Sequence, residues 1–118
     1  MQEIKREGAG KRFSEAVIYN GVVYLAGQVP EDPSADFKGQ TRQVLAQTEA
    51  QLAKYGSSKM RILSCQIFLA DIRHIAAMNE IWDSWVVPGH APARATVEAR
   101  LSSPEKLIEV CVSAALEA

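Results

Sequence analysis

The sequence predicts an α+β fold in which two helices lie on one face of a mixed β-sheet. Two long stretches, residues 37–55 and the stretch that follows Asp71, repeat their apolar residues at the 3.6-residue period of a helix. Shorter stretches before, between and after them alternate apolar and polar residues or are continuously apolar, which indicates strands. The predicted element order is therefore β-β-α-β-α-β-β.

The first two strands are predicted over residues 12–19 and 22–28, on either side of Asn20-Gly21. Asn-Gly is the dipeptide most typical of a two-residue hairpin turn, because both of its residues accept a positive φ. The proline-containing stretch 28–34 then predicts a loop. This part of the chain should form a β-hairpin that leads into the first helix.

The first helix is predicted over residues 37–55, with Gly56 placed to end it. A strand over 62–69 follows. Its residues expected to face the helices are Leu63, Cys65, Ile67 and Leu69. Asp71 is suited to cap the second helix. The apolar stripe predicted for that helix is Ile72, Ile75, Met78, Trp82, Trp85 and Val86.

Two final strands are predicted over 93–101 and 107–116, joined by a turn at 102–105. In the last strand Ile108 and Val110 suit a core covered by helices, whereas Glu109 lies on the opposite side. A solvated sheet face is normally richer in charged residues than the opposite faces of these strands. The half-polar face is more typical of a subunit interface, which favours an oligomer.

The bulk composition indicates one domain spanning residues 1–118. The chain has 47% hydrophobic and 23% charged residues, as ordinary globular domains do. Its net charge of −1 excludes the basic footprint typical of nucleic-acid binding. It has no apolar run long enough for a membrane span and no signal-peptide core. We expect a cytoplasmic protein with neither a membrane nor a nucleic acid as partner.

Metal binding is not expected either. The two histidines, His74 and His90, fall in different predicted elements and have no ligand spacing to Cys65 or Cys111. Both cysteines lie in strand-like stretches, where a buried free thiol is usual and fits a reducing compartment.

Arg94 is the first candidate functional residue, because it opens a strand directly after a turn marked by Pro92. A guanidinium there can hold a planar anion through two parallel hydrogen bonds. The alternative is a solvated arginine at a strand end. Along its strand Arg94 shares the more polar side with Thr96. If burial of the apolar sides sets the register of a final hairpin, the polar sides carrying Arg94 and Glu109 should coincide.

Several segments occur in an order and spacing that resemble a known family over about residues 12–115. They are Tyr24-Leu25-Ala26-Gly27-Gln28-Val29-Pro30, Ile67-Phe68-Leu69-Ala70-Asp71, Met78-Asn79-Glu80-Ile81-Trp82, Pro92-Ala93-Arg94-Ala95-Thr96-Val97-Glu98 and Leu107-Ile108-Glu109-Val110. Together they resemble the Rid family of reactive-intermediate deaminases, also labelled YjgF or endoribonuclease L-PSP. The stretch 81–92 looks closer to a bacterial side branch than to the archetypal deaminase. The resemblance implies a chorismate-mutase-like fold and a homotrimeric barrel with clefts between subunits.

The activity implied by the resemblance is hydrolysis of 2-imino acids, or their enamine tautomers, to 2-oxo acids and ammonia without a metal or organic cofactor. Arg94 matches the carboxylate-binding arginine of the family, and Glu109 matches the acidic residue that positions water. Gly27 matches a glycine that allows close backbone approach to a ligand, although it also fits an ordinary strand-end glycine.

Three matched positions depart from the archetype. Phe13 replaces a tyrosine, Ala26 replaces a serine and Thr96 replaces a cysteine. Phe13 and Ala26 each remove a hydroxyl that could bond substrate or water.

Two functional classes therefore stay open. Arg94 and Glu109 favour a deaminase, whereas the substitutions favour a non-catalytic trimer that binds small carboxylates or a protein partner. A ribonuclease, suggested only by the family label, is a distant third.

Overall fold

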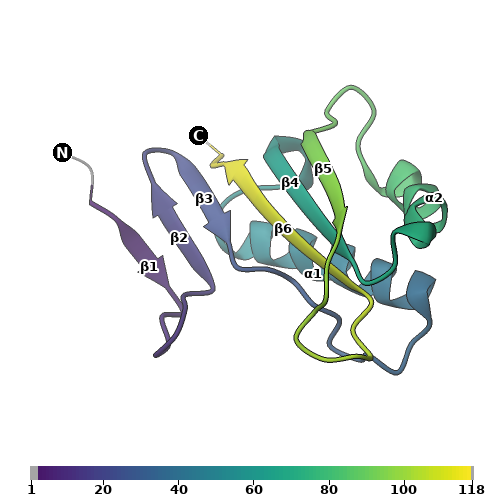
Figure 1. The fold of residues 1–118 in the computed structure, drawn as a ribbon. Helices are drawn as coiled ribbons and strands as arrows, with labels where there is room; N and C mark the ends of the chain where they lie inside the picture. Colours follow the sequence, from purple (N-terminus) through teal and green to yellow (C-terminus); the bar gives the residue numbers. More distant parts are fainter. Residues whose placement is uncertain (1–2, 118) are drawn as a thin grey trace.

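In the computed structural model, which describes residues 3–117, six strands form one mixed sheet in the order β1-β2-β3-β6-β4-β5 (Figure 1). The strands are β1 (Lys5–Glu7), β2 (Ala16–Tyr19), β3 (Val22–Leu25), β4 (Ile62–Leu69), β5 (Ala93–Glu98) and β6 (Ile108–Ala115). β4 and β5 are parallel, and all the other neighbours are antiparallel. The structure confirms the predicted mixed sheet.

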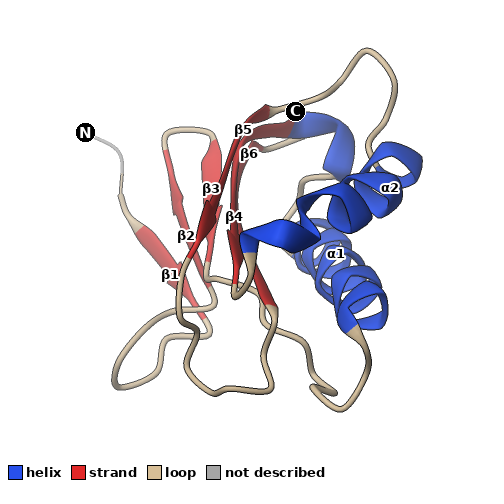
Figure 2. Ribbon diagram, turned by 45° about the vertical axis from the view of Figure 1, so that its right-hand side comes forward, coloured by secondary structure: helices blue, strands red, loops and turns tan. Residues whose placement is uncertain are grey.

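Both α-helices of the described chain, α1 (Phe37–Lys54) and α2 (Ile75–Trp85), lie on the same side of the sheet, as Figure 2 shows. Short 3₁₀ turns, η1 (Lys59–Arg61) and η2 (Ile72–His74), precede β4 and α2. The other face of the sheet carries no helix in residues 3–117, and we call it the open face. No helix in that part of the chain is long and apolar enough to cross a membrane.

α1 begins and ends where local sequence signals place it. The Asp36 side chain caps its first turn by accepting a hydrogen bond from the Gly39 amide at 2.8 Å. Gly56 follows its last turn with φ +86°, a conformation that glycine adopts without steric cost. The prediction of a helix over 37–55 is therefore confirmed to within one residue.

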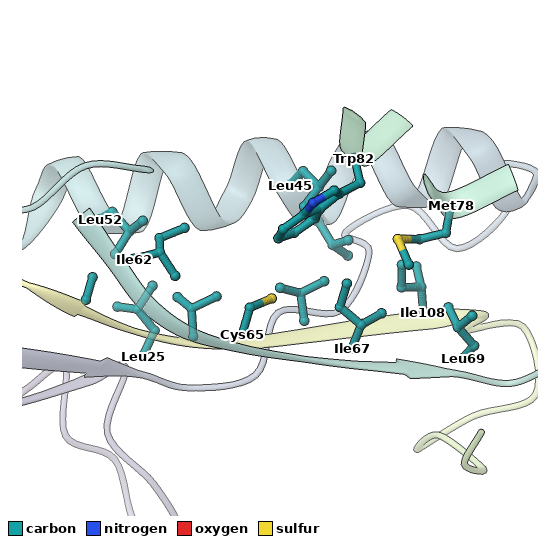
Figure 3. Packing of buried hydrophobic residues seen from close by; sticks show 14 of the residues in the cluster. Leu25, Leu45, Leu52, Ile62, Cys65, Ile67, Leu69, Met78, Trp82 and Ile108 are labelled. Atoms are coloured by element: carbon teal, nitrogen blue, oxygen red, sulfur yellow. The ribbon is translucent and has the colours of Figure 1, made fainter. Parts of the chain in front are cut away.

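The hydrophobic core lies between the helices and the inner face of the sheet (Figure 3). Leu45 and Leu52 of α1 and Met78 and Trp82 of α2 point down onto side chains of the sheet. The inner face of β6 is buried as predicted, at Ile108, Val110, Val112 and Ala114. Burial of this apolar area is what positions the strands that carry the candidate functional residues.

The strands differ from the prediction in several bounds and in one register. β3 ends at Leu25 rather than at residue 28, and β5 ends at Glu98 rather than at residue 101. β1 was not predicted, and β2 begins only at Ala16, so residues 12–15 belong to the loop before it. In β4 a register shift lies between Ile62 and Ser64. Such a bulge turns neighbouring side chains to the opposite face. Leu63 is therefore 49% exposed, contrary to its predicted place in the core, and Ile62 is buried instead.

The start of the second helix was also placed too early. Asp71 caps the 3₁₀ turn η2 by accepting from the Arg73 amide at 2.9 Å, and α2 begins only at Ile75. Ile72 and Ile75 are exposed, whereas Met78 and Trp82 are buried. The 3₁₀ turn rotates the first apolar residues away from the sheet, because its period is shorter than that of an α-helix.

The final two strands do not form a hairpin, contrary to the expectation from their sequence. β4 lies between them, parallel to β5 and antiparallel to β6. β5 is consequently an edge strand. Its polar residues Arg94 and Thr96 turn toward the helices and its apolar Val97 toward the open face, where 47% of Val97 is exposed.

Candidate functional site

Arg94 lies on the helix-covered face of the sheet, at the beginning of β5. Its β4 partner is Cys65, which is buried in the core. The Arg94 Nη2 atom donates a hydrogen bond to the Asn79 side-chain oxygen of α2 at 2.8 Å. The guanidinium carbon stands 4.9 Å from the ring centroid of Trp82, also on α2, within the range of a cation–π interaction. α2 therefore orients the guanidinium through one neutral acceptor and one aromatic face.

The charge of Arg94 is not neutralised by a carboxylate among residues 3–117, because none of the ion pairs there includes it. A guanidinium has five N–H donors, and Asn79 takes one of them. An oriented and unpaired guanidinium is suited to bind a small anion. The adjacent Cys65 thiol is not a nucleophile at neutral pH, since burial raises its pKa to about 12.

Glu109 lies on the open face of the sheet, near the beginning of β6. It is paired with Phe68 of β4, which in turn is paired with Val97 of β5. The next residue on the same face is Cys111, whose thiol pKa is raised by burial and by the nearby Glu109 carboxylate. The Glu109 carboxylate forms no ion pair within the described chain. It is free to accept a proton or a hydrogen bond.

Gly27 lies against the Glu109 carboxylate. A Cβ atom built on Gly27 would overlap the Glu109 Oε2 atom and come within 3.0 Å of its Cδ. The neighbouring Gln28 forms an isolated bridge with Val110, in which N–O distances of 2.7 and 3.0 Å fix the two backbones. Glycine is therefore required here for a close approach of backbone and carboxylate.

The other candidate residues fall on both sides of the sheet. Ala26 precedes Gly27, and its amide donates to the Glu15 carbonyl at 2.9 Å. Phe13 projects from the loop before β2, with 68% of its surface exposed. Thr96 lies beside Arg94 under α2, and its hydroxyl oxygen is buried without a hydrogen-bond partner in residues 3–117.

The structure thus brings the candidate residues together as two separate groups. One group contains Arg94 and Thr96 on the helix-covered face. The other contains Glu109, Gly27 and Ala26, with Glu109 on the open face. The expectation that the polar sides of the last two strands coincide is wrong. Residues paired across a sheet share a face, and Arg94 pairs with Cys65 of β4 whereas Glu109 pairs with Phe68. Since Cys65 and Phe68 are three residues apart along one strand, they point to opposite faces.

Sequence reasoning missed the contribution of Asn79 and Trp82. Asn79 was not among the candidate functional residues, and Trp82 was placed only in the apolar stripe predicted for the second helix. Trp82 is indeed buried in the core, but both side chains contact Arg94. The only signal in the sequence is a spacing of three residues, which places both on one side of a helix.

The residues present offer no evident place for a metal ion. Within residues 3–117 no three His, Cys, Asp or Glu side chains gather as ligands would.

The chain as a whole matches a known protein class. The family model described as Endoribonuclease L-PSP matches residues 3–116. The chain therefore belongs to this family, which is the Rid or YjgF family identified from its sequence segments.

Individual relatives are similar over nearly their whole length. The chain is 49% identical to the RutC family protein YoaB of Escherichia coli, covering 96% of this chain and 98% of that protein. It is 46% identical to a RutC family protein of Haemophilus ducreyi, covering 96% and 97%. A crystal structure of a YjgF family member from Neisseria meningitidis superimposes with a TM-score of 0.92 at 43% identity, covering 98% and 97%.

Proposed function

We propose that this protein hydrolyses reactive 2-imino acids, or their enamine tautomers, to 2-oxo acids and ammonia. The reaction takes place in the cytoplasm, in clefts between the subunits of a homotrimer. Each cleft combines Arg94 of one subunit with Glu109 and Gly27 of the next, and neither a metal nor an organic cofactor takes part.

The arrangement of the single chain supports an intersubunit cleft. Arg94 and Glu109 face opposite sides of one sheet, so a second subunit is needed to bring their side chains together. The open face also presents apolar side chains: Tyr24 is 49% exposed and Val97 is 47% exposed. Exposed apolar area of this kind, framed by polar residues, marks a protein–protein contact. Packing of open faces against each other would bury it.

The chemistry requires few groups. A protonated imine carbon is already electrophilic, so water adds to it and the resulting carbinolamine expels ammonia as the C=O bond forms. Arg94 holds the substrate carboxylate with two parallel hydrogen bonds. Glu109 accepts a proton from the attacking water, returns it to the leaving nitrogen, and then takes up the hydroxyl proton as ammonia leaves and the C=O bond forms. Holding these partners in place accounts for the acceleration of an intrinsically easy reaction.

The observation that carries the proposal is the state of Arg94. Its guanidinium is oriented by Asn79 and Trp82, yet no carboxylate in residues 3–117 neutralises it. A structural arginine in a partly buried position would normally be paired with a carboxylate. A ligand carboxylate would supply the missing partner.

A second candidate function is binding of small carboxylates, or of a protein partner, without turnover. It is favoured by Phe13 and Ala26, which offer no hydroxyl, and by Thr96, whose hydroxyl is buried. The Arg94 anion site would be the same in both functions. Turnover of an imine therefore separates them.

The test couples the purified protein to an amino-acid oxidase and follows the loss of the imine. We expect Arg94→Ala to lower kcat/KM by about a hundredfold, because charge-assisted hydrogen bonds contribute about 2–3 kcal/mol. Arg94→Lys should recover little, since an ammonium group lacks the planar fork. Arg42→Ala, which removes an exposed arginine on α1, is the matched control. Unchanged imine loss in Arg94→Ala would disprove the role of Arg94, and a parent protein that does not hasten imine loss would disprove the deaminase. Binding of a 2-oxo acid without turnover would establish the second function.

A further inference from the structure

The loop between β5 and β6, which follows the end of β5 (Figure 1), borders a hollow of about 340 Å³. Arg94 lies at the other end of β5. Its polar lining comes from Arg100, Ser102, Ser103 and Lys106. We propose that this hollow is a second ligand site, which binds a small phosphate monoester independently of the Arg94 site.

Positive charge dominates the hollow. Neither Arg100 nor Lys106 forms an ion pair with a carboxylate of residues 3–117. The Lys106 Nζ atom donates to the Ser102 hydroxyl at 2.9 Å, which turns the ammonium group back over the loop. The nearby Asp71 is occupied by Arg73 at 2.8 Å. Glu105, the one carboxylate within residues 99–107, does not line the hollow. The two cations are therefore available to an anion.

A buried hydroxyl in the same loop lacks a partner. The Ser103 Oγ atom is shielded from solvent and makes no hydrogen bond with any described residue. Leaving a buried polar group unsatisfied costs free energy, so such a group points to a missing partner. Rotation about the Ser103 Cα–Cβ bond would bring its hydroxyl to the hollow, where a phosphate oxygen would accept the hydrogen bond while Arg100 and Lys106 neutralise the charge.

The loop is held in place before any ligand arrives. Gln40 of α1 is fully buried, and its Nε2 atom donates to the Glu105 carbonyl while its Oε1 atom accepts from the Leu107 amide, both at 2.8 Å. The Lys106 amide donates to the Ser103 carbonyl at 3.2 Å. A preorganised loop reduces the entropy lost on binding, which is what a ligand site requires.

The size and lining of the hollow indicate an ester rather than a free ion. Ligand sites usually occupy about 300–1,000 Å³, which a bare phosphate ion would not fill. Ala70, Leu101 and Pro104 supply apolar surface beside the cations, and this surface would contact the organic group of the ester. Donors converging from different residues suit a tetrahedral phosphate better than a planar carboxylate. The hollow is also distant from Arg94, since the part of β5 from Arg94 to Glu98 alone spans about 13 Å.

The experiment titrates the full-length protein with phenyl phosphate and, separately, with inorganic phosphate, at an ionic strength held constant with chloride. Binding is measured by calorimetry, and its location by backbone amide NMR shifts. We expect saturable binding of phenyl phosphate with shifts centred on residues 100–106. Arg100→Gln and Lys106→Gln should each weaken it about tenfold, because each removes a charge-assisted hydrogen bond. Because Arg100 is exposed, Arg100→Gln should leave the loop folded, and it still tests the site if Lys106→Gln disturbs the loop.

Two controls separate this site from other sources of binding. Lys11→Gln removes an exposed cation from another loop and should leave the affinity unchanged. Arg94→Ala should also leave it unchanged, even if that variant loses imine hydrolysis, so failure of this proposal and failure of the proposed function are distinguishable. The proposal is overturned if binding is not saturable, if neither cation in the hollow matters, or if Arg94→Ala abolishes binding. It is likewise overturned if inorganic phosphate binds as tightly as the ester.

Discussion

The Arg94 end of the candidate site is held by side chains of a helix, whereas the Glu109 end is held by the backbone of the sheet. Asn79 and Trp82 reach down from α2 to orient the guanidinium. Glu109 instead lies against Gly27, whose strand end is joined to β6 by the backbone bridge between Gln28 and Val110.

Because the two ends are held differently, substitutions at each end should affect the site differently. The guanidinium of Arg94 is oriented by separate side-chain contacts, and each contact that is removed orients it less well. Substitutions of its partners should therefore weaken ligand binding in graded steps. The Glu109 carboxylate packs against backbone that the bridge between Gln28 and Val110 holds in place, so a single carbon added to Gly27 should displace the carboxylate itself and have a steep effect on activity. The two ends also face opposite sides of the sheet, so in the proposed site Arg94 and Glu109 would meet only across a subunit boundary.

The largest expected effect tests that boundary directly. Arg94→Ala and Glu109→Gln should each be nearly inactive alone, yet a refolded equal mixture should regain roughly a quarter of the parental activity, because heterologous interfaces unite residues of two subunits. A quarter follows if subunits mix at random, since half supply Arg94 and half supply Glu109.

The mixture needs one control and one check. The double variant Arg94→Ala/Glu109→Gln, mixed with either single variant, should regain nothing. Native mass spectrometry should confirm that mixed trimers have formed. Mixed trimers without recovered activity, or a chain that stays monomeric at micromolar concentration, would contradict an intersubunit site.

Gly27→Ala should have the next largest effect. Its Cβ would overlap the Glu109 carboxylate, so that flexible side chain must swing away, at a smaller cost than the about 1–3 kcal/mol of overpacking in a core. We expect kcat to fall by at least about tenfold through displacement of Glu109, with little change in the affinity for a 2-oxo acid held by Arg94. Chemical denaturation supplies the check: the double variant Gly27→Ala/Glu109→Ala should regain the lost stability but not the activity. Loss of 2-oxo acid binding in Gly27→Ala alone would count against separate roles.

On the Arg94 side, the Asn79 variants should show smaller and graded effects. Asn79→Ala should weaken 2-oxo acid binding by about tenfold, because it removes one hydrogen bond to a charged group. Asn79→Asp should weaken binding further without lowering Tm, since its carboxylate would compete with the ligand for Arg94. Ser84→Ala, on an exposed position of the same helix, is the control for calorimetric titration. Equal affinities in Asn79→Ala and Asn79→Asp would mean that Arg94 is not the anion site.

The sequence predicted those parts of the fold whose signals are local. The bounds of α1 were predicted from its apolar period and from Gly56, and the Asp36 cap that the structure adds is equally local. The inner face of β6 follows from simple alternation. In contrast, the bulge beside Leu63 and the placement of β4 between β5 and β6 depend on partners far along the chain. Alternation in a single strand cannot reveal either one.

The candidate site shows the same division. Family resemblance singled out Arg94 and Glu109 as individual residues, but not the face on which each lies. On an edge strand, pattern alone suggests that the apolar side is buried. In β5 the polar side is covered instead, because α2 provides Asn79 and Trp82 as partners for Arg94. Such contacts between a helix and a strand arise from tertiary packing and leave little trace in residue spacing.

The smallest expected effect concerns the turn that positions α2, and through it the Arg94 end of the site. Asp71 accepts hydrogen bonds from the Arg73 side chain and amide, which lower the pKa of its carboxyl group to about 2. A lowered pKa in the folded state means that the ionised group stabilises the fold above its ordinary pKa, and that this contribution is lost as pH falls toward 2. Because the pair is exposed, Asp71→Asn should lower Tm at pH 7 by no more than about 3 °C. The difference from the parent should vanish between about pH 4 and pH 2. Asp83→Asn, at an exposed position of α2, should show neither effect. Calorimetric melts across this pH range decide the matter: a difference that persisted at pH 2 would show that Asp71 acts through packing rather than through its charge.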